Sequence, residues 1–382
     1  MEPRSTIRIS AVGDIALNGR YNQIVNAGNL RALATSVAPL LAGSDIAVGN
    51  LEGPLTTRPS VGPAWCFTLR GHPAYAPILR DAGLNVLSLA NNHMMDHGWE
   101  GLEDTCTHLR AAGIRYFGAG RSLREAREPL RITVRGLRIA FLAYCNVSVL
   151  SPIYADVDRP GVAPARRSYI LADIAAAQRE NNVVIVCMHW GQEHVRYPAP
   201  KHRRLAFEMI AAGANLIIGH HPHVLQGVER VAKGAVSYSL GNFVFSEEDW
   251  QGTNRKGEHF SMPYRLSESA RRAAVWRVVM DGQGPVLDEH LVPTYLGPDL
   301  LPALDRRPEC QTEIARNRKA LSRRGYRLLW TIQMTRSRIR AILDQFRGNE
   351  SIGRRLLHLR PRHLREMLQV LIREWEQLRG VE

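Results

Sequence analysis

Short apolar runs alternate with helix-like stretches along the first 250 residues of the chain. The apolar runs are TIRISAVGD, DIAVGNLE, NVLSLANNH, LRIAFLAYC, VVIVCMHWG, NLIIGHH and AVSYSLGNF, and helical patterns over 98–112, 166–180 and 201–213 separate several of them. Short continuous apolar runs of this kind are typical of strands that are buried on both faces. The pattern therefore predicts an α/β domain with a layered sheet.

The chain changes character near residue 300. Residues 255–300 continue the β pattern with AVWRVVMDGQGPVLDEHLV, in which DGQG indicates a turn. Residues 301–382 then contain 19 Lys and Arg against 9 Asp and Glu, in a chain whose net charge is +14, and they show helical periodicity, as in HLREMLQVLIREWEQL. We expect a core domain over 1–300 and a basic helical extension over 301–382.

The composition narrows the class of protein. Of the 382 residues 45% are hydrophobic, and the five cysteines form no Cys-x-x-Cys pair, which argues against a disulfide framework or a zinc knuckle. The N-terminal segment MEPRSTIRISAVGD lacks the apolar stretch of a signal peptide. No apolar run reaches the ~18 residues needed to span a bilayer. We expect a cytoplasmic protein, with peripheral binding at the inner membrane as the alternative.

Five of the predicted strands end in polar side chains. Ligands of open α/β sheets bind beyond the carboxyl ends of the strands, so these side chains are expected to share one site. The clusters are Asp14, Asn50 with Glu52, Asn91 with Asn92 and His93, His189 with Glu193, and His220 with His221 and His223.

The residue types in these clusters favour a site for two metal ions. Imidazole and carboxylate groups bind divalent transition metals, and a bridging carboxylate holds two ions ~3.5–4 Å apart. The sequence therefore predicts a site for Mn, Fe, Zn or Mg, without selecting among them. The candidate ligands are Asp14, Glu52, Asn92, His189, His221 and His223.

Other polar residues are candidates for catalysis and substrate binding. His93 follows Asn92, so we expect it to donate a proton to a leaving oxygen. Asp96 either orients His93 or caps the next helix. Glu193 is either a partner of a ligating histidine or a loop charge, and Asn242 lies in a turn that lines the cleft. The predicted substrate-binding residues are Asn50, Asn91, Glu193, His220 and Asn242.

Seven segments together resemble the CapA family, bacterial capsule synthesis proteins associated with poly-γ-glutamate. They occur in the order GDIALNGR (13–20), NLEGPLT (50–56), LANNHMMDHG (89–98), GVAP (161–164), HWGQEH (189–194), GHHPHVLQGVE (219–229) and SLGNF (239–243). The resemblance covers roughly residues 7–250. It implies a calcineurin-like metallophosphoesterase fold, a layered α/β/β/α sandwich of two mixed sheets with helices outside.

The resemblance also implies roles for the candidate ligands. Asp14 and His223 would bind one metal, and Asn92, His189 and His221 the other. Glu52 would bridge the two ions, and His93 would act on the leaving group. The sequence departs from the wider superfamily at Ala16, where a histidine is usual, and at Glu52, where an aspartate is usual.

These features predict metal-dependent hydrolysis or transfer at a phosphoester or a related anionic substrate. The family resemblance alone implies capsule or poly-γ-glutamate biosynthesis as the context. Two alternatives stay open: a non-catalytic accessory that binds polymer or scaffolds a synthase, and an amide hydrolase or transferase acting on polyglutamate. The expected partners are an anionic polymer or a phosphate-containing substrate. We also expect the basic extension to bind a capsule synthase or an anionic membrane surface. Nucleic acid is not expected, because no nucleic-acid-binding motif accompanies the charge.

Overall fold

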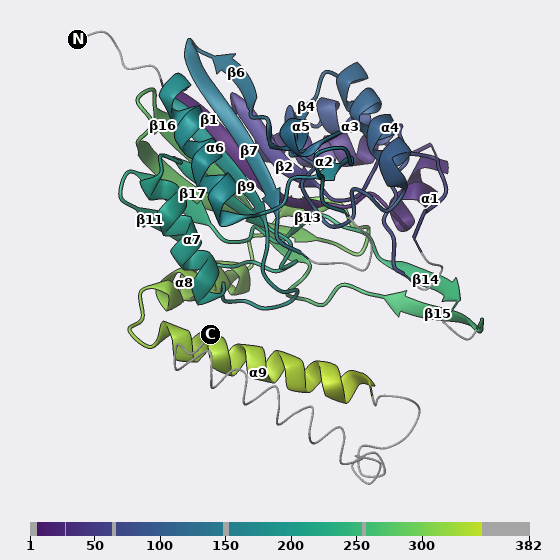
Figure 1. Ribbon diagram of the computed structural model, residues 1–382. Coiled ribbons are helices and arrows are strands. Elements are labelled where there is room, and N and C mark those ends of the chain that lie inside the picture. The colour runs from purple at the N-terminus through teal and green to yellow at the C-terminus, as the bar shows by residue number, and fades with distance from the viewer. Residues whose placement is uncertain (1–5, 27, 63–65, 148–152, 254–256, 346–382) are drawn as a thin grey trace.

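Two β-sheets pack face to face in the computed structural model, and helices cover their outer faces (Figure 1). The structure describes residues 6–26, 28–62, 66–147, 153–253 and 257–345. Within these residues the predicted α/β/β/α sandwich is confirmed, and each of the seven apolar runs contains a strand.

The larger sheet has the strand order β18-β17-β16-β1-β2-β3-β4, and β13 pairs with the end of β1. Strands β1 to β4 are parallel, so their carboxyl ends lie at the same edge of the sheet. Its strands are β1 (Thr6–Ile15), β2 (Ile46–Leu51), β3 (Val86–Ser88), β4 (Arg115–Phe117), β13 (Asn242–Val244), β16 (Arg272–Asp281), β17 (Val286–Leu296) and β18 (Pro302–Leu304).

The second sheet has the order β11-β12-β10-β9-β7-β6, with β7, β9, β10 and β12 parallel. Its strands are β6 (Leu130–Val134), β7 (Leu137–Cys145), β9 (Val183–His189), β10 (Leu216–His220), β11 (Val228–Val231) and β12 (Gly234–Ser237). Two small pairs complete the strands: β5 (Ala119–Gly120) with β8 (Gly161–Val162), and a hairpin of β14 (Glu248–Thr253) and β15 (His259–Tyr264).

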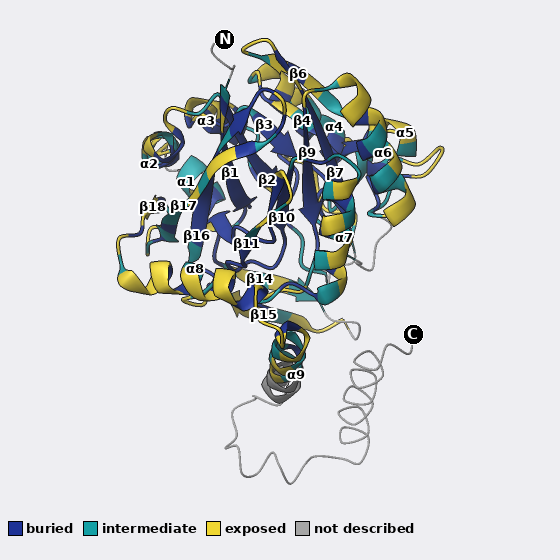
Figure 2. Ribbon diagram, turned by 90° about the vertical axis from the view of Figure 1, so that its left-hand side faces the viewer, coloured by how far each residue is buried: buried dark blue, intermediate teal, exposed yellow. Residues whose placement is uncertain are grey.

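Strand β9 shows why its sequence is apolar throughout. Successive side chains of a strand point to opposite faces of the sheet. Val183, Ile185 and Cys187 therefore join the core between the two sheets. Val184 and Met188 face the core beneath the covering helices. Both faces are buried, as the dark central strands in Figure 2 show, so a polar residue in the middle of this strand would lose water on either side.

The helices connect the strands and cover the sheets. The predicted helices over 98–112, 166–180 and 201–213 correspond to α4, α6 and α7, and their ends agree to within two residues. The helices are α1 (Arg20–Asn26), α2 (Arg31–Leu41), α3 (Tyr75–Asp81), α4 (Gly98–Ala111), α5 (Leu123–Arg127), α6 (Arg167–Glu180), α7 (Pro200–Ala211), α8 (Pro308–Leu321) and α9 (Tyr326–Gln345).

The described part of the predicted extension contacts the core. The boundary that we predicted at residue 301 falls just before β18, which pairs with β17 of the larger sheet. Helix α8 packs against β11 and β17, and α9 lies below the sandwich (Figure 1). In the part of the chain that is described, no helix combines the length and apolarity needed to cross a membrane. Residues 346–382, with the helical pattern HLREMLQVLIREWEQL, lie outside the described residues.

Candidate metal centre

The two sheets bring their polar strand ends together. Strand register places Asp14 of β1 opposite Asn50 of β2 and Asn242 of β13. In the second sheet the register places His189 of β9 opposite His220 of β10. The expectation that the strand-end clusters share one region agrees with this geometry.

Close backbone packing holds Asp14 at this position. The Asp14 amide donates to the carbonyl oxygen of Gly241, which is 3.0 Å away. A Cβ atom on Gly13 would lie 1.8 Å from the same oxygen, so β1 and the segment before β13 require glycine at position 13. Gly241 has a φ of +74°, which favours glycine there as well.

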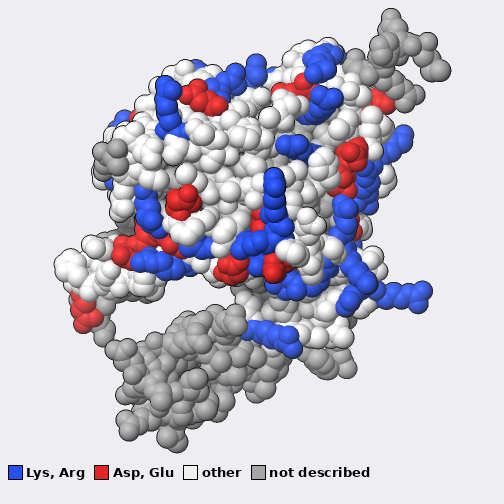
Figure 3. All heavy atoms as spheres, turned by 180° about the vertical axis from the view of Figure 1, so that it is seen from behind, with Lys and Arg blue, Asp and Glu red and all other residues white. Residues whose placement is uncertain are grey.

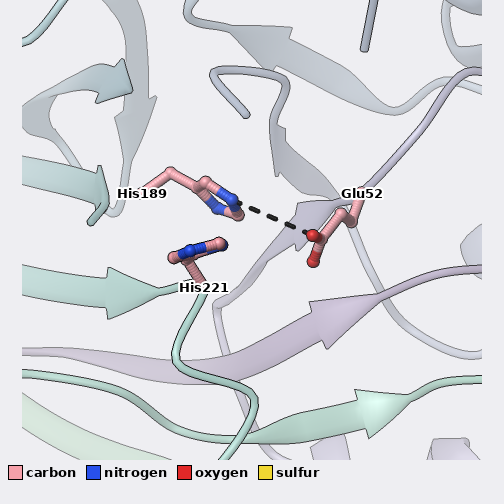
Figure 4. Close-up of side chains that lie close together, drawn as sticks. All are labelled: Glu52, His189 and His221. Carbon is pink, nitrogen blue, oxygen red and sulfur yellow. Dashed lines mark ion pairs between the residues drawn. The ribbon is translucent and has the colours of Figure 1, made fainter. Parts of the chain in front are cut away.

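Glu52 lies in the middle of the predicted ligands. Its Oε1 atom is 3.6 Å from His223 Nε2 and 3.9 Å from His189 Nε2, the second of which is drawn in Figure 4. His223 Nδ1 is in turn 3.5 Å from Asp14 Oδ2. Two groups of ligand atoms, Asp14–Glu52–His223 and Glu52–His189–His221, each lie within 4.8 Å of one another and share Glu52.

Burial makes this arrangement unfavourable without a cation. Burial raises the pKa of Glu52 well above its usual range, and the charges of Asp14 and Glu193 raise it further. Burial also lowers the pKa of His189 and of His221 well below the usual value, so these imidazoles are neutral at pH 7 and able to bind metal. Both Glu52 oxygens are buried without a hydrogen-bond partner among the described residues. The donor set fits divalent metal ions.

Asparagine side chains orient the ligands from behind. His223 Nδ1 lies 2.9 Å from Asn242 Oδ1, which leaves Nε2 facing Glu52. The Asn50 amide donates to Asp14 Oδ1 over 2.9 Å, and Asn50 Oδ1 accepts from Asn91 Nδ2 over 3.1 Å. These three asparagines, predicted to bind substrate, are fully buried and bonded to protein groups. Their geometry supports the positioning of ligands, as is common around metal sites.

The histidine loop after β10 has an unusual backbone. His221 and His223, on either side of Pro222, have φ angles of +93° and +55°. Such angles are uncommon for residues with a side chain and cluster at functional sites. The His221 amide donates to Asp14 Oδ2 over 3.1 Å, so the loop is tied to β1 of the other sheet.

The other predicted residues take different positions around the centre. His189 Nε2 is 2.7 Å from Asn92 Oδ1, which brings this predicted ligand to the centre. His220 is buried, and its Nε2 atom faces the Val12 carbonyl oxygen at 3.2 Å. Glu193 is exposed, yet it forms a third candidate ligand group with His221 and His223.

His93 is oriented by Asp96. His93 Nδ1 lies 2.8 Å from Asp96 Oδ2, and the same oxygen accepts from the Leu69 amide over 2.7 Å. Helix α4 begins at Gly98 after His97, so the structure supports the orienting role of Asp96 rather than the alternative of a helix cap. Asp96 therefore fixes the orientation of the His93 ring through its Nδ1 atom.

Aromatic residues beside the centre were not predicted from the sequence. The Phe245 ring packs edge-on against His223, with centroids 4.9 Å apart, and the Phe67 ring packs edge-on against His93 at 6.3 Å. Tyr264 of β15 contacts both phenylalanines. Phe67 and Tyr264 lie far apart in the sequence, and no local pattern indicates that they meet.

Fold and site define a layered α/β/β/α protein with a buried carboxylate–imidazole centre between the ends of its sheets. The comparison with protein families extends this: the chain belongs to the bacterial capsule synthesis protein family PGA_cap, whose model matches residues 8–247. The match contains every predicted ligand and ends before the hairpin of β14 and β15.

Curated relatives agree with this family. The capsule biosynthesis protein CapA of Bacillus anthracis is 33% identical over 270 residues, which are 69% of this chain and 64% of that protein. The PGA biosynthesis protein CapA of Bacillus subtilis is 34% identical over 262 residues, 68% of each chain. A probable polyglutamine synthesis accessory protein of Mycobacterium tuberculosis is 32% identical over 219 residues, 55% of this chain and 57% of that one. The chain thus spans about two thirds of the length of the two Bacillus relatives.

Solved structures with a similar arrangement are distant in sequence. A phosphatase of Mycoplasma pneumoniae aligns with a TM-score of 0.48 and 12% identity, covering 81% of this chain and 98% of that one. A 5′-nucleotidase precursor of Thermus thermophilus aligns with a TM-score of 0.41 and 11% identity, covering 82% of this chain and 58% of that one.

Proposed function

We propose that this protein is a metal-dependent hydrolase that acts on a phosphoester, or a related anionic group, during capsule polymer biosynthesis. The observation that carries the proposal is the buried Glu52 carboxylate. Asp14 and His223 lie on one side of it and His189 and His221 on the other, and neither of its oxygens has a hydrogen-bond partner among the described residues. A buried carboxylate in this setting favours bound cations. The names of the Bacillus relatives support the link to capsule and poly-γ-glutamate biosynthesis.

The residues divide into two sets of ligands that share one member. Asp14 and His223 would hold one divalent ion. The other ion would be held by His189, His221 and Asn92, and Glu52 would bind both ions. Two such ions, when bound, supply Lewis acidity toward the phosphoryl oxygens and lower the pKa of a water nucleophile. The buried asparagines hold the ligands in place, so little reorganisation accompanies binding.

His93 would hold the proton that the leaving oxygen needs. Its Nδ1 atom is occupied by Asp96, which fixes the ring orientation. Its side chain is 16% exposed, so a substrate can reach Nε2. Proton donation by a positioned histidine contributes ~10²–10⁴-fold to the rate of such a step.

The first test is metal content. We expect purified protein to bind about two Mn²⁺ ions, and the double variant His221→Ala/His223→Ala to lose most of this metal, as measured by elemental analysis after desalting. His290→Ala, which removes an exposed histidine on β17, is the matched control and should retain the metal. A folded wild-type protein that binds no metal under replete conditions would contradict the proposal.

The second test separates catalysis from binding. His93→Ala should retain the metal and lose turnover of an alkyl phosphoester such as methyl phosphate by ~10²-fold or more in Mn²⁺, because the departing alkoxide has no proton donor. Unchanged turnover in this variant would contradict the assigned role. Metal binding without any turnover would favour an accessory role, the one printed in the name of the Mycobacterium relative.

A further inference from the structure

The hairpin of β14 and β15 has one aromatic face. Its register places Trp250 opposite Met262 and Gly252 opposite Phe260. Directly opposed residues of an antiparallel pair point to the same side, so Tyr264, Met262, Trp250 and Phe260 share that side. Glu248, opposite Tyr264, is the charged residue on that side, and the alternate positions are polar apart from Pro263. Figure 1 shows this hairpin extending from the body of the molecule.

A continuous wall of rings connects this face to the metal centre. The Phe67 ring lies 5.6 Å from Trp250 and 5.8 Å from Tyr264, and it also packs against His93. Trp250 packs edge-on against Phe260, with centroids 4.8 Å apart. The proposed proton donor and the outer part of the hairpin are therefore joined by ring contacts.

A cavity of about 510 Å³ lies between the hairpin and the residues Ser60, Gly62, Cys66 and Thr68. Trp250 and Phe260 supply its aromatic surface, and both are half-buried. Ser60 and Thr68 bring hydroxyl groups to its lining, which also includes Cys66 and His259. Among the described residues that line the cavity there is no Asp, Glu, Lys or Arg, although 23% of the chain is charged.

A second cavity, of about 570 Å³, has the opposite character. It lies between α1 and the hairpin and is lined by Arg20, Glu247, Asp249 and Arg265, among others. These charges pair with one another: Arg20 lies 3.8 Å from Glu247, and Arg265 binds Asp249. The remaining charged group of the described lining, Glu248, accepts a hydrogen bond from Asn18 Nδ2 over 2.7 Å, so the charged groups of this cavity are each bound to another protein group.

We infer that the uncharged cavity is a substrate subsite, and that it binds an uncharged ring with hydrogen-bonding groups at its rim. Sugar rings and nucleobases have this chemistry: their faces stack on aromatic side chains, and their polar edges bind hydroxyl and amide groups. An extended polyanion such as oligo-γ-glutamate does not, because it has no ring and the described lining of the cavity includes no Lys or Arg. The inference rests on the proposed phosphoester hydrolysis and names the class of substrate.

The position of Phe67 indicates that the substrate ring bound in the cavity belongs to the leaving group of the ester. Phe67 lies between His93 and Trp250, so a ring in the cavity is on the side of the proton donor. Water adds its oxygen to phosphorus, the ester P–O bond breaks, and the departing oxygen takes the His93 proton. The products are the phosphate group and the ring-bearing alcohol, and the proton from water returns His93 to its starting state.

The test compares ligands that differ in the ring. Isothermal titration of Mn²⁺-loaded protein would use four probes: glucose 1-phosphate, uridine 5′-monophosphate, methyl phosphate and a short oligo-γ-glutamate. We expect one of the two ring-bearing probes to bind about ten- to a hundredfold more tightly than methyl phosphate, the range of an aromatic stacking contact. Which of the two prevails distinguishes a sugar from a nucleobase.

The variants assign this preference to the cavity. Trp250→Ala and Phe260→Ala should remove most of it, whereas Trp250→Phe should restore part. Met262→Ala is the matched control, because Met262 is 52% exposed on the same hairpin face and outside the cavity lining. Near-wild-type melting temperatures would show that the variants fold.

Two outcomes would overturn the subsite. One is a preference that survives Trp250→Ala and Phe260→Ala in folded protein. The other is tighter binding of methyl phosphate or oligo-γ-glutamate than of either ring-bearing probe. Failure of the proposed function gives a different result. In that case the protein binds no metal and hydrolyses no phosphoester, yet it keeps a Trp250-dependent preference for one ring. This result would contradict the hydrolase function and leave the subsite supported.

Discussion

At the scale of single residues, Glu193 connects solvent to the metal centre. Its carboxylate is exposed, yet an oxygen lies within 4.8 Å of ligand nitrogens of His221 and His223. Removing this charge should weaken metal binding, because ligands and their immediate partners typically contribute ~10–100-fold to affinity. We predict that Glu193→Gln lowers Mn²⁺ affinity about tenfold in chelator competition. Glu180→Gln, on the exposed face of α6, should leave it unchanged, and equal affinities for both variants would refute the contact.

The proximity of the polar residues at the strand ends could be predicted, because parallel strands bring their carboxyl ends to one edge of a sheet. That rule, applied to the sequence, places Asp14, Glu52 and His189 in one region, where the structure also puts them. It does not say which way an amide points. Asn50 and Asn91 were therefore predicted at the substrate face, whereas their amides bond to Asp14 and to each other beneath the centre.

At the scale of elements, α8 supports the loop that carries His221 and His223, although it lies beyond the segment that matches the family. The buried Asn317 side chain donates to the Leu225 carbonyl oxygen over 2.9 Å, two residues after His223. Asn317→Ala leaves that buried oxygen unpaired, which should lower the free energy of unfolding by ~1–3 kcal/mol in urea titrations. Mn²⁺ affinity should fall several-fold, because the loop is then less well ordered before metal binds.

The matched control is Ser322→Ala, at the exposed end of α8, which should change neither quantity. A loss of stability with unchanged Mn²⁺ affinity would show that α8 stabilises the fold without positioning the ligands.

The existence of α8 follows from local periodicity, as does that of the buried strands. Its docking does not, because the contact between Asn317 and Leu225 spans 92 residues and depends on two elements that share no pattern. The hairpin face beside Phe67 was missed for the same reason.

At the scale of the whole molecule, the basic charge of the chain is partly used within the fold. Arg307 binds Asp305, Arg318 binds Glu289, and these arginines belong to the region that we predicted as a basic extension. Figure 3 shows Lys and Arg interspersed with Asp and Glu on the back of the described molecule. Single exposed ion pairs contribute ~0–1 kcal/mol, so this pairing affects where anionic partners could bind more than it affects stability.

Stability of the whole molecule should depend on pH through buried histidines. His202 stacks on Trp190 with centroids 5.1 Å apart, and burial lowers the pKa of His202 to about 4. His202 has a pKa of ~6.5 in the unfolded chain, so the unfolded chain binds a proton there at a higher pH than the folded protein does. The free energy of unfolding therefore falls as the pH drops from ~6.5 towards 4. His202→Phe keeps a stacking ring and removes this titration. We predict that its loss of unfolding free energy between pH 7.5 and 4.5 is ~2–3 kcal/mol smaller than in wild type.

The comparison uses urea unfolding in EDTA, which keeps metal binding out of the pH dependence. Burial raises the pKa of Asp14 and of Glu52, so these groups change stability with the opposite sign, but they are common to both proteins and cancel in the difference. His290→Gln, at an exposed position, should show the wild-type dependence. If His202→Phe loses as much stability as wild type over this pH range, His202 accepts its proton in the folded state, and the Trp190 stack tolerates a charged imidazole.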